Sequence, residues 1–202
     1  KTDRQSLPPR PRRSQACAGA RAMTASSAPN LAACAKTGDW QRALQLLDVL
    51  RSPTKGDYGA AVFVCTKAGQ WEAALRLLDV WCTAPPSGPD ALAYAQAMQA
   101  CYRSGESDRA LELFDRLDGL TKDAACFNAA ITACGKTGRW QKAMRLLDEM
   151  LEHGPAPTAR SYSAAITACG KSGECDRALQ LLGDMGRHRL QPDCICYAAA
   201  IT

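Results

Sequence analysis

Histidine is scarce in this chain, and the cysteines lack the spacing of metal ligands. Only two histidines occur among the 202 residues, and none of the eleven cysteines forms a Cys-x-x-Cys pair. Zinc sites in proteins commonly use such pairs or combine cysteine with histidine. The zinc deaminase pattern of His-x-Glu with Cys-x-x-Cys is missing as well. We therefore predict no metal site, no cofactor and no catalytic residues.

Long apolar runs are also missing. No run reaches the roughly 18 residues that a membrane-spanning helix needs, so we expect no association with a membrane. No segment alternates polar and apolar residues long enough to predict a β-sheet.

Excess positive charge is confined to one end of the chain. Residues 1–23 hold six lysines and arginines and one aspartate, which accounts for the whole formal net charge of +5. Residues 24–202 are therefore neutral, which disfavours strong sequence-independent binding to phosphate but leaves room for a local basic stripe. The composition of residues 1–23 fits a disordered tail, the start of an organelle transit peptide or an ordinary solvated linker.

Against these absences stands a tandem repeat. Five cysteines recur at intervals of 31, 36, 33 and 35 residues, and a glycine follows each of them four residues later. The cysteines are Cys34, Cys65, Cys101, Cys134 and Cys169. Tandem copies of one small unit predict an extended binding surface rather than a catalytic pocket.

The copies have consistent boundaries. Residues 124–158 align with residues 159–193 without a gap, and the remaining copies follow the same frame. These are residues 24–54, 55–90 and 91–123, with a partial copy at 194–202. Because the chain begins with Lys1 and stops inside a copy, we expect a fragment of a longer protein.

Each copy predicts two helices. In residues 124–158 we expect the first from Phe127 to Lys136 and the second from Trp140 to Leu151, where apolar residues recur at spacings of three, four and seven. Gly138 between them suits a left-handed helix end. A single pair cannot bury its apolar face. The sequence therefore predicts an all-α fold, an α-solenoid of about five and a quarter helix-turn-helix repeats of 31–36 residues.

The recurring cysteines are predicted to be buried thiols in a reducing compartment. Equivalent residues of stacked helices lie roughly 8–10 Å apart, whereas the Cα atoms of a disulfide approach within about 7 Å. The tryptophans that open the second helices, Trp40, Trp71 and Trp140, are expected in the core between repeats, with base stacking as the alternative.

The unit resembles the pentatricopeptide repeat family over Thr24–Thr202. The residues that carry the resemblance are Tyr162-Ser-Ala-Ala-Ile-Thr-Ala-Cys-Gly-Lys-Ser-Gly173, the second-helix pattern Ala-Leu-x-Leu-Leu-x-x-Met from Ala178, and the closing Pro192-Asp193. The tetratricopeptide repeat fits less well, because here a tryptophan opens the second helix and the unit ends in Pro-Asp.

The resemblance implies a right-handed superhelix that binds single-stranded RNA, one base per repeat. It further implies a monomer in a mitochondrion or plastid (chloroplast) that acts in organellar RNA processing, stability, editing or translation. Protein partners from an RNA-processing complex are compatible with it.

In the family, the residue after the first-helix aromatic and the last residue of the repeat contact the base. Ser163 with Asp193 then implies a purine, most often guanine. Asn128 with Thr158 implies a pyrimidine, either uracil or cytosine. In the two preceding copies the pairs are Gly59 with Asp90 and Ala95 with Asp123, and poor selectivity is expected because glycine and alanine offer no side-chain hydrogen bond.

The resemblance also implies two further sets of contacts. Residues that pack against bases would be Leu92, Ala125, Arg160 and Ile195. Residues that contact phosphates would be Lys67, Arg103, Lys136 and Lys171, which share one frame position with Lys36. A second interpretation of this cationic position is a favourable charge at a helix C-terminus, worth about 0.3–1 kcal/mol.

Two other functions remain open from the sequence. The neutral array and its Gly and Ala positions also fit a scaffold that binds proteins. The chain could equally be the recognition part of an enzyme whose catalytic domain lies outside these residues.

Overall fold

The structure is a computed structural model that describes residues 28–50, 52–83, 88–117 and 122–201. The predicted tail, residues 1–23, lies outside the described residues. Within the described ranges the chain forms α-helices and no strand. The helices are α1 (Ala28–Thr37), α2 (Trp40–Val49), α3 (Lys55–Lys67), α4 (Trp71–Thr83), α5 (Ala91–Arg103), α6 (Ser107–Asp115), α7 (Ala124–Thr137), α8 (Trp140–His153), α9 (Ala159–Lys171), α10 (Cys175–Arg187) and α11 (Cys194–Ile201).

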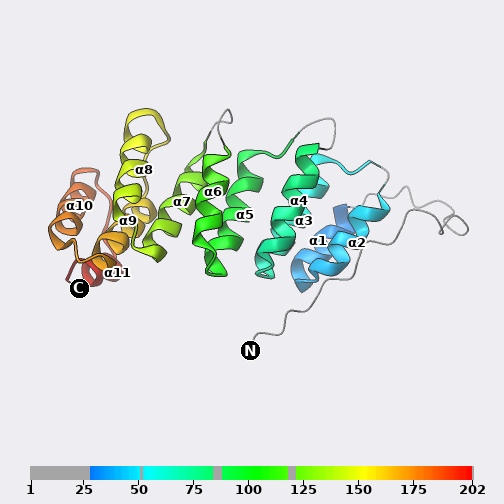
Figure 1. Cartoon of the computed structure of the whole chain (residues 1–202), viewed down its shortest axis with the longest axis horizontal. Coiled ribbons are helices and arrows are strands. Elements are labelled where there is room, and N and C mark those ends of the chain that lie inside the picture. The colour runs from blue at the N-terminus through cyan, green and yellow to red at the C-terminus, as the bar shows by residue number, and fades with distance from the viewer. Residues whose placement is uncertain (1–27, 51, 84–87, 118–121, 202) are drawn as a thin grey trace, which may run out of the picture.

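The helices form two layers. Each odd-numbered helix packs against the next odd-numbered helix, so that α1, α3, α5, α7, α9 and α11 make one continuous layer. Each even-numbered helix packs on its own partner and on the following odd-numbered helix. Successive pairs follow one another along the long axis, from α1 and α2 at one end to α10 and α11 at the other (Figure 1). The predicted all-α solenoid of tandem helix pairs is confirmed.

A left-handed glycine separates the two helices of every complete pair. The φ angles of these glycines run from 69° at Gly138 to 94° at Gly105, in a region that other residues rarely adopt. The remaining three are Gly38, Gly69 and Gly173. At Gly138 the backbone N–H donates to the carbonyl of Cys134 and so ends α7. The recurring glycine has the role that its position in the sequence predicted.

The helix starts differ from the prediction. The first helix of residues 124–158 begins at Ala124, three residues before the predicted Phe127. The reason is a cap: Asp123 Oδ1 accepts a hydrogen bond of 2.9 Å from the backbone N–H of Cys126. The second helix runs two residues beyond the predicted Leu151 and ends at His153, where the N–H of Gly154 donates to the carbonyl of Met150.

The recurring cysteines lie in the core as free thiols. Cys65, Cys101, Cys134 and Cys169 are fully buried, and Cys34 is 3% exposed. They occupy the layer of odd-numbered helices, where a small side chain allows neighbouring helices to pack. The prediction of buried thiols without disulfides is confirmed for these five residues.

The three helix-opening tryptophans are less buried than expected. Trp40, Trp71 and Trp140 are half-buried and pack against the edge of the core. Each opens its helix and therefore lies near the end of a helix pair, where part of the ring meets solvent. The fully buried tryptophan is instead Trp81, whose ring stacks on Tyr58 with centroids 5.3 Å apart.

Two glycines set the spacing of the last odd-numbered helices. A Cβ atom added to Gly135 on α7 would lie 2.7 Å from the carbonyl oxygen of Ala164 on α9. A Cβ atom on Gly170 would meet the carbonyl of Ala199 on α11 in the same way. Both helix pairs therefore approach closely only because these positions lack a side chain.

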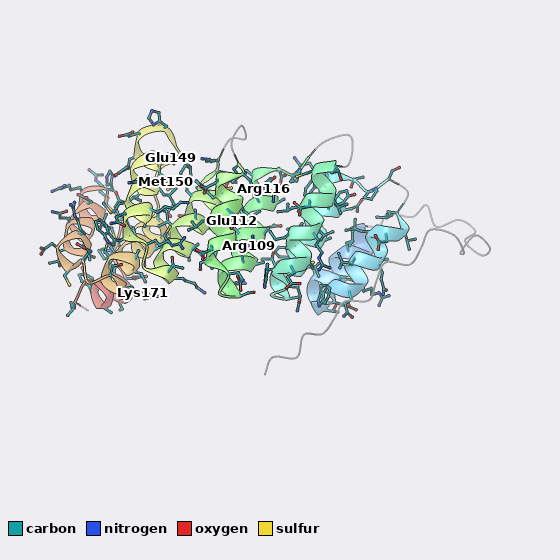
Figure 2. All side chains as sticks on the ribbon, in the orientation of Figure 1. Arg109, Glu112, Arg116, Glu149, Met150 and Lys171 are labelled. Atoms are coloured by element: carbon teal, nitrogen blue, oxygen red, sulfur yellow. The ribbon has the colours of Figure 1, made fainter. Side chains whose placement is uncertain are left out.

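Ion pairs join successive even-numbered helices on the outside of the array. Arg116, just after α6, bonds Asp79 of α4 at 2.9 Å, and Lys142 of α8 bonds Asp115 of α6 at 3.2 Å. Figure 2 labels Arg116 beside α6. Both aspartates are exposed, so each ion pair contributes little to stability on its own. No helix of the described residues is long and apolar enough to cross a membrane.

Candidate nucleic-acid interface

A groove of about 480 Å³ lies along the layer of odd-numbered helices, between α7, α9 and α11. Its walls come from three successive repeats. Six predicted contact residues line it together: Lys136, Arg160, Ser163, Lys171, Asp193 and Ile195. Figure 2 shows Lys171 at the end of α9 that lies near α11. The fold thus brings one predicted pair of base-contacting residues together with two predicted packing residues and two cations.

The last residue of each repeat has a structural role that the sequence interpretation missed. Asp90, Asp123 and Asp193 each precede an odd-numbered helix. In each, Oδ1 accepts a hydrogen bond of 2.9 Å from the backbone N–H three residues later. They are therefore N-caps, and one carboxylate oxygen of each is already engaged. The signal was present in the sequence, because an aspartate before a helix start is the usual N-cap pattern.

The carboxylate of Asp193 is exposed at the mouth of the groove. Hydrogen bonds from the thiol and the backbone N–H of Cys196 lower its pKa below the usual value of 3.8. Asp193 is thus ionised at neutral pH, and its second oxygen can accept a hydrogen bond from a base.

Asp90 is engaged at both oxygens. While Oδ1 caps α5, Oδ2 lies 3.1 Å from Nζ of Lys55, the first residue of the same repeat. Its partner position, Gly59, offers open space, since nothing lies within 4 Å of an added Cβ atom. Ala95, the partner of Asp123, is 6% exposed and adds no polar group. These two repeats present little hydrogen-bonding chemistry to a base.

Asn128 and Thr158 meet in a small hydrogen-bond network. Asn128 Oδ1 accepts from Ser161 Oγ at 2.6 Å and from Thr158 Oγ1 at 3.4 Å. Thr158 and Ser161 also form a capping box at the start of α9. The structure thus brings the predicted pair together, but it adds Ser161, which the sequence interpretation did not single out. A serine three residues after a threonine N-cap was the available signal.

The predicted packing residues project from the odd-numbered helices and are exposed. Leu92 and Ile195 are 55% and 61% exposed, which leaves two large apolar side chains available to a flat base. Ala125 and Arg160 are exposed as well. Arg160 Nη2 donates to the hydroxyl of Tyr102 at 3.3 Å, so this guanidinium reaches back from α9 to α5.

The predicted phosphate-contacting residues form an exposed series along the ends of the odd-numbered helices. Lys136 Nζ donates to the carbonyl of Tyr102 at 2.8 Å, and Lys171 Nζ donates to the carbonyl of Lys136 at 2.9 Å. Each of these two cations therefore meets the C-terminal carbonyls of the preceding odd-numbered helix, not of its own. An ammonium group has three donors, so both can still bond a phosphate oxygen.

The other two members of this series differ from each other. The ammonium of Lys67 lies over the ring of Phe63, 5.4 Å from its centroid, whereas Arg103 is an exposed guanidinium at the end of α5. Among the described residues, no group of three or more His, Cys, Asp or Glu side chains lies close enough to hold a metal ion.

Comparison with known protein families gives overlapping matches across the second half of the chain. The model of the PPR (pentatricopeptide repeat) family matches residues 122–171. The model of the single PPR repeat matches residues 93–120 and 160–190. No curated protein matches the chain significantly.

Solved structures of the same architecture superpose on most of the chain. The crystal structure of the pentatricopeptide repeat protein PPR10 in complex with an 18-nt psaJ RNA element is 30% identical, with a TM-score of 0.70 over 87% of this chain. PPR10 from maize is 29% identical, with a TM-score of 0.71 over 88% of this chain. The chain spans 26% of the length of either PPR10 structure.

The PPR domain of Arabidopsis thaliana protein-only RNase P 1, solved in complex with tRNA, is 15% identical with a TM-score of 0.71, a likeness of fold alone. It covers 85% of this chain and 93% of that one. The helix pairs, their left-handed glycines and the matched repeats agree on one conclusion: the chain belongs to the pentatricopeptide repeat family.

Proposed function

We propose that this chain binds single-stranded RNA along the layer of odd-numbered helices. The observation that carries the proposal is the groove between α7, α9 and α11. It joins a carboxylate, a hydroxyl, exposed apolar surface and two cations from three successive repeats. Single-stranded RNA needs this combination, because its bases are unstacked and its backbone is anionic.

Each repeat would contact one base. The pair Ser163 and Asp193 offers a hydroxyl and an ionised carboxylate, which suits the two N–H donors of guanine. The pair Asn128 and Thr158 would take a pyrimidine. Leu92, Ala125, Arg160 and Ile195 would pack on the bases, and Lys67, Arg103, Lys136 and Lys171 would contact phosphates.

The biological setting follows from the family. We propose a monomeric adaptor in a mitochondrion or plastid that takes part in organellar RNA metabolism and recruits protein partners. In this proposal the repeats bind RNA and do not catalyse a reaction. The PPR10 structure was solved with an RNA element, and that supports RNA as the ligand class.

Binding of the purified full chain to fluorescent oligonucleotides tests the proposal. Single-stranded RNA should bind more tightly than double-stranded RNA or single-stranded DNA of equal length. Affinity should fall as salt rises, with a slope set by the few phosphates that the cation series contacts. Lys136→Gln with Lys171→Gln should reduce that slope by roughly two. Binding to none of the three at micromolar protein, with capture of a peptide instead, would favour the protein scaffold.

A further inference from the structure

One contact recurs between successive odd-numbered helices. The third residue of a repeat lies against the fifth residue of the preceding repeat, which is the predicted base-contacting residue. Ser161 bonds the side chain of Asn128 at 2.6 Å. Cys196 and Ser163 both line the groove, and the thiol lies close enough to Ser163 for that side chain to affect its pKa. The thiol of Cys126 donates to the carbonyl of Ala91 at 3.2 Å. The same thiol also lies beside the backbone of Ala95.

The contact at Ser161 fixes the orientation of the Asn128 side-chain amide. Ser161 is fully buried, and its hydroxyl oxygen accepts a hydrogen bond of 3.1 Å from the backbone N–H of Thr158. A hydroxyl carries one hydrogen, and the shortest acceptor for it is Asn128 Oδ1. Thr158 Oγ1 also lies 3.4 Å from that oxygen. The carbonyl end of Asn128 is therefore held against α9, and its NH₂ group is the end left for a ligand.

We propose that Ser161 is a positioning residue that turns Asn128 into a hydrogen-bond donor toward the RNA base. The inference rests on the proposed function and goes beyond it, because the residue that sets the base preference of one repeat then belongs to the next repeat. Ser161 itself touches no base.

The hydrogen-bonding groups of the bases determine which base a donor at Asn128 would prefer. On their Watson–Crick edges, uracil and cytosine each carry two acceptors, whereas adenine and guanine each carry one. Guanine carries two N–H donors on that edge. A base-contacting side chain that only donates hydrogen bonds therefore prefers a pyrimidine, and it does not distinguish uracil from cytosine. A base-contacting side chain that only accepts hydrogen bonds prefers guanine.

Two substitutions separate this positioning role from a packing role. Ser161→Ala removes the hydroxyl, so the amide of Asn128 can turn. The ratio of pyrimidine affinity to purine affinity at this position should then fall from roughly 5 to about 1. Ser161→Asp supplies only acceptors, so the NH₂ group should turn toward α9 and the preference should shift to guanine. Asp57 already occupies the same position in its own repeat, where it forms a capping box with Thr54, so this helix start accepts an aspartate.

The matched control is Cys126→Ala. It removes the equivalent side chain one repeat earlier, behind Ala95, which has no polar side chain to turn. Base preference should be unchanged at every position in this variant.

The experiment measures binding of the full chain and its variants to a set of single-stranded RNAs that differ at one position. It also follows the side-chain NH₂ resonances of Asn128 by NMR without RNA. Loss of preference in Ser161→Ala, its inversion in Ser161→Asp and shifted Asn128 resonances support the inference. An unchanged preference in both variants, or unchanged resonances, overturns it. If the Asn128 resonances shift in the Ser161 variants but the wild-type chain binds no RNA, the proposed function is overturned while the geometry at Asn128 stands.

Discussion

The buried thiols explain why cysteine recurs without forming disulfides. Burial raises the pKa of Cys65 and Cys101 from 9.0 to about 12, and that of Cys134 to about 11. In the folded chain these groups stay protonated at neutral pH, and a protonated thiol is a poor nucleophile. They act as small apolar side chains in the core.

Because the folded pKa of these thiols exceeds the unfolded value, the stability they contribute is complete below about pH 9 and is lost as pH rises toward 12. Denaturant unfolding between pH 8 and 11 should therefore show a falling free energy of unfolding. Cys65→Ala should flatten that decline, although it lowers stability at pH 8 by leaving a small cavity. Cys194→Ala, at an exposed thiol, is the control and should leave the slope unchanged.

Gly59 offers a second test at the scale of one residue. Gly59→Ser places a hydroxyl in open space on α3 and gives this repeat the same pair of residue types as Ser163 with Asp193. Replacing a helical glycine should raise stability by about 0.5 kcal/mol, seen as a higher urea midpoint. In RNA binding, this variant should gain a purine preference at one position. Gly183→Ser, at an open position of α10, should give the stability gain alone.

At the scale of the element, close helix packing depends on two glycines. Gly135→Ala should force α9 away from α7, because the new Cβ atom would lie 2.7 Å from a backbone carbonyl. We expect a loss of about 1–3 kcal/mol in the free energy of unfolding. Gly183→Ala has nothing within 4 Å of its new Cβ atom and should stabilise α10 by up to about 1 kcal/mol. Equal effects of the two substitutions in urea unfolding would contradict the account of helix spacing.

The elements could largely be predicted from the sequence, because their signals are local. The solenoid is predicted by three local features together: an apolar stripe on each second helix, a glycine after each first helix, and the inability of a single helix pair to bury its apolar face. The start of α7 was placed late because Asp123 was assigned to base contact and not considered as a cap. The depth of Trp140 was overestimated, since spacing gives the buried face of a helix but not how much of a terminal side chain is covered.

The candidate site was predictable only in part, for a reason of geometry. Aligned repeats identify which positions recur, and the groove does bring Ser163 and Asp193 together. The side chains that restrain those positions come from the next repeat, as Ser161 does for Asn128. Such contacts depend on how the helices stack, and a single sequence does not show which side chains of neighbouring repeats touch.

At the scale of the whole molecule, the distribution of charge determines which contacts contribute to RNA affinity. Residues 24–202 are neutral, and the outer layer of even-numbered helices pairs several of its charges between repeats. The described cations of the groove lie along the ends of the odd-numbered helices. Affinity for RNA should therefore depend on a few local phosphate contacts and on base contacts, rather than on a general attraction to anions.

The most direct measurement of the central claim is selection of bound sequences from a randomised single-stranded RNA pool. The full wild-type chain and the double variant Asn128→Ser with Thr158→Asp should be compared. The account predicts that the wild type enriches a pyrimidine next to guanine and that the double variant replaces the pyrimidine with guanine. Enrichment of no sequence by the wild type, or the same sequence from both proteins, would contradict base contact by these repeats.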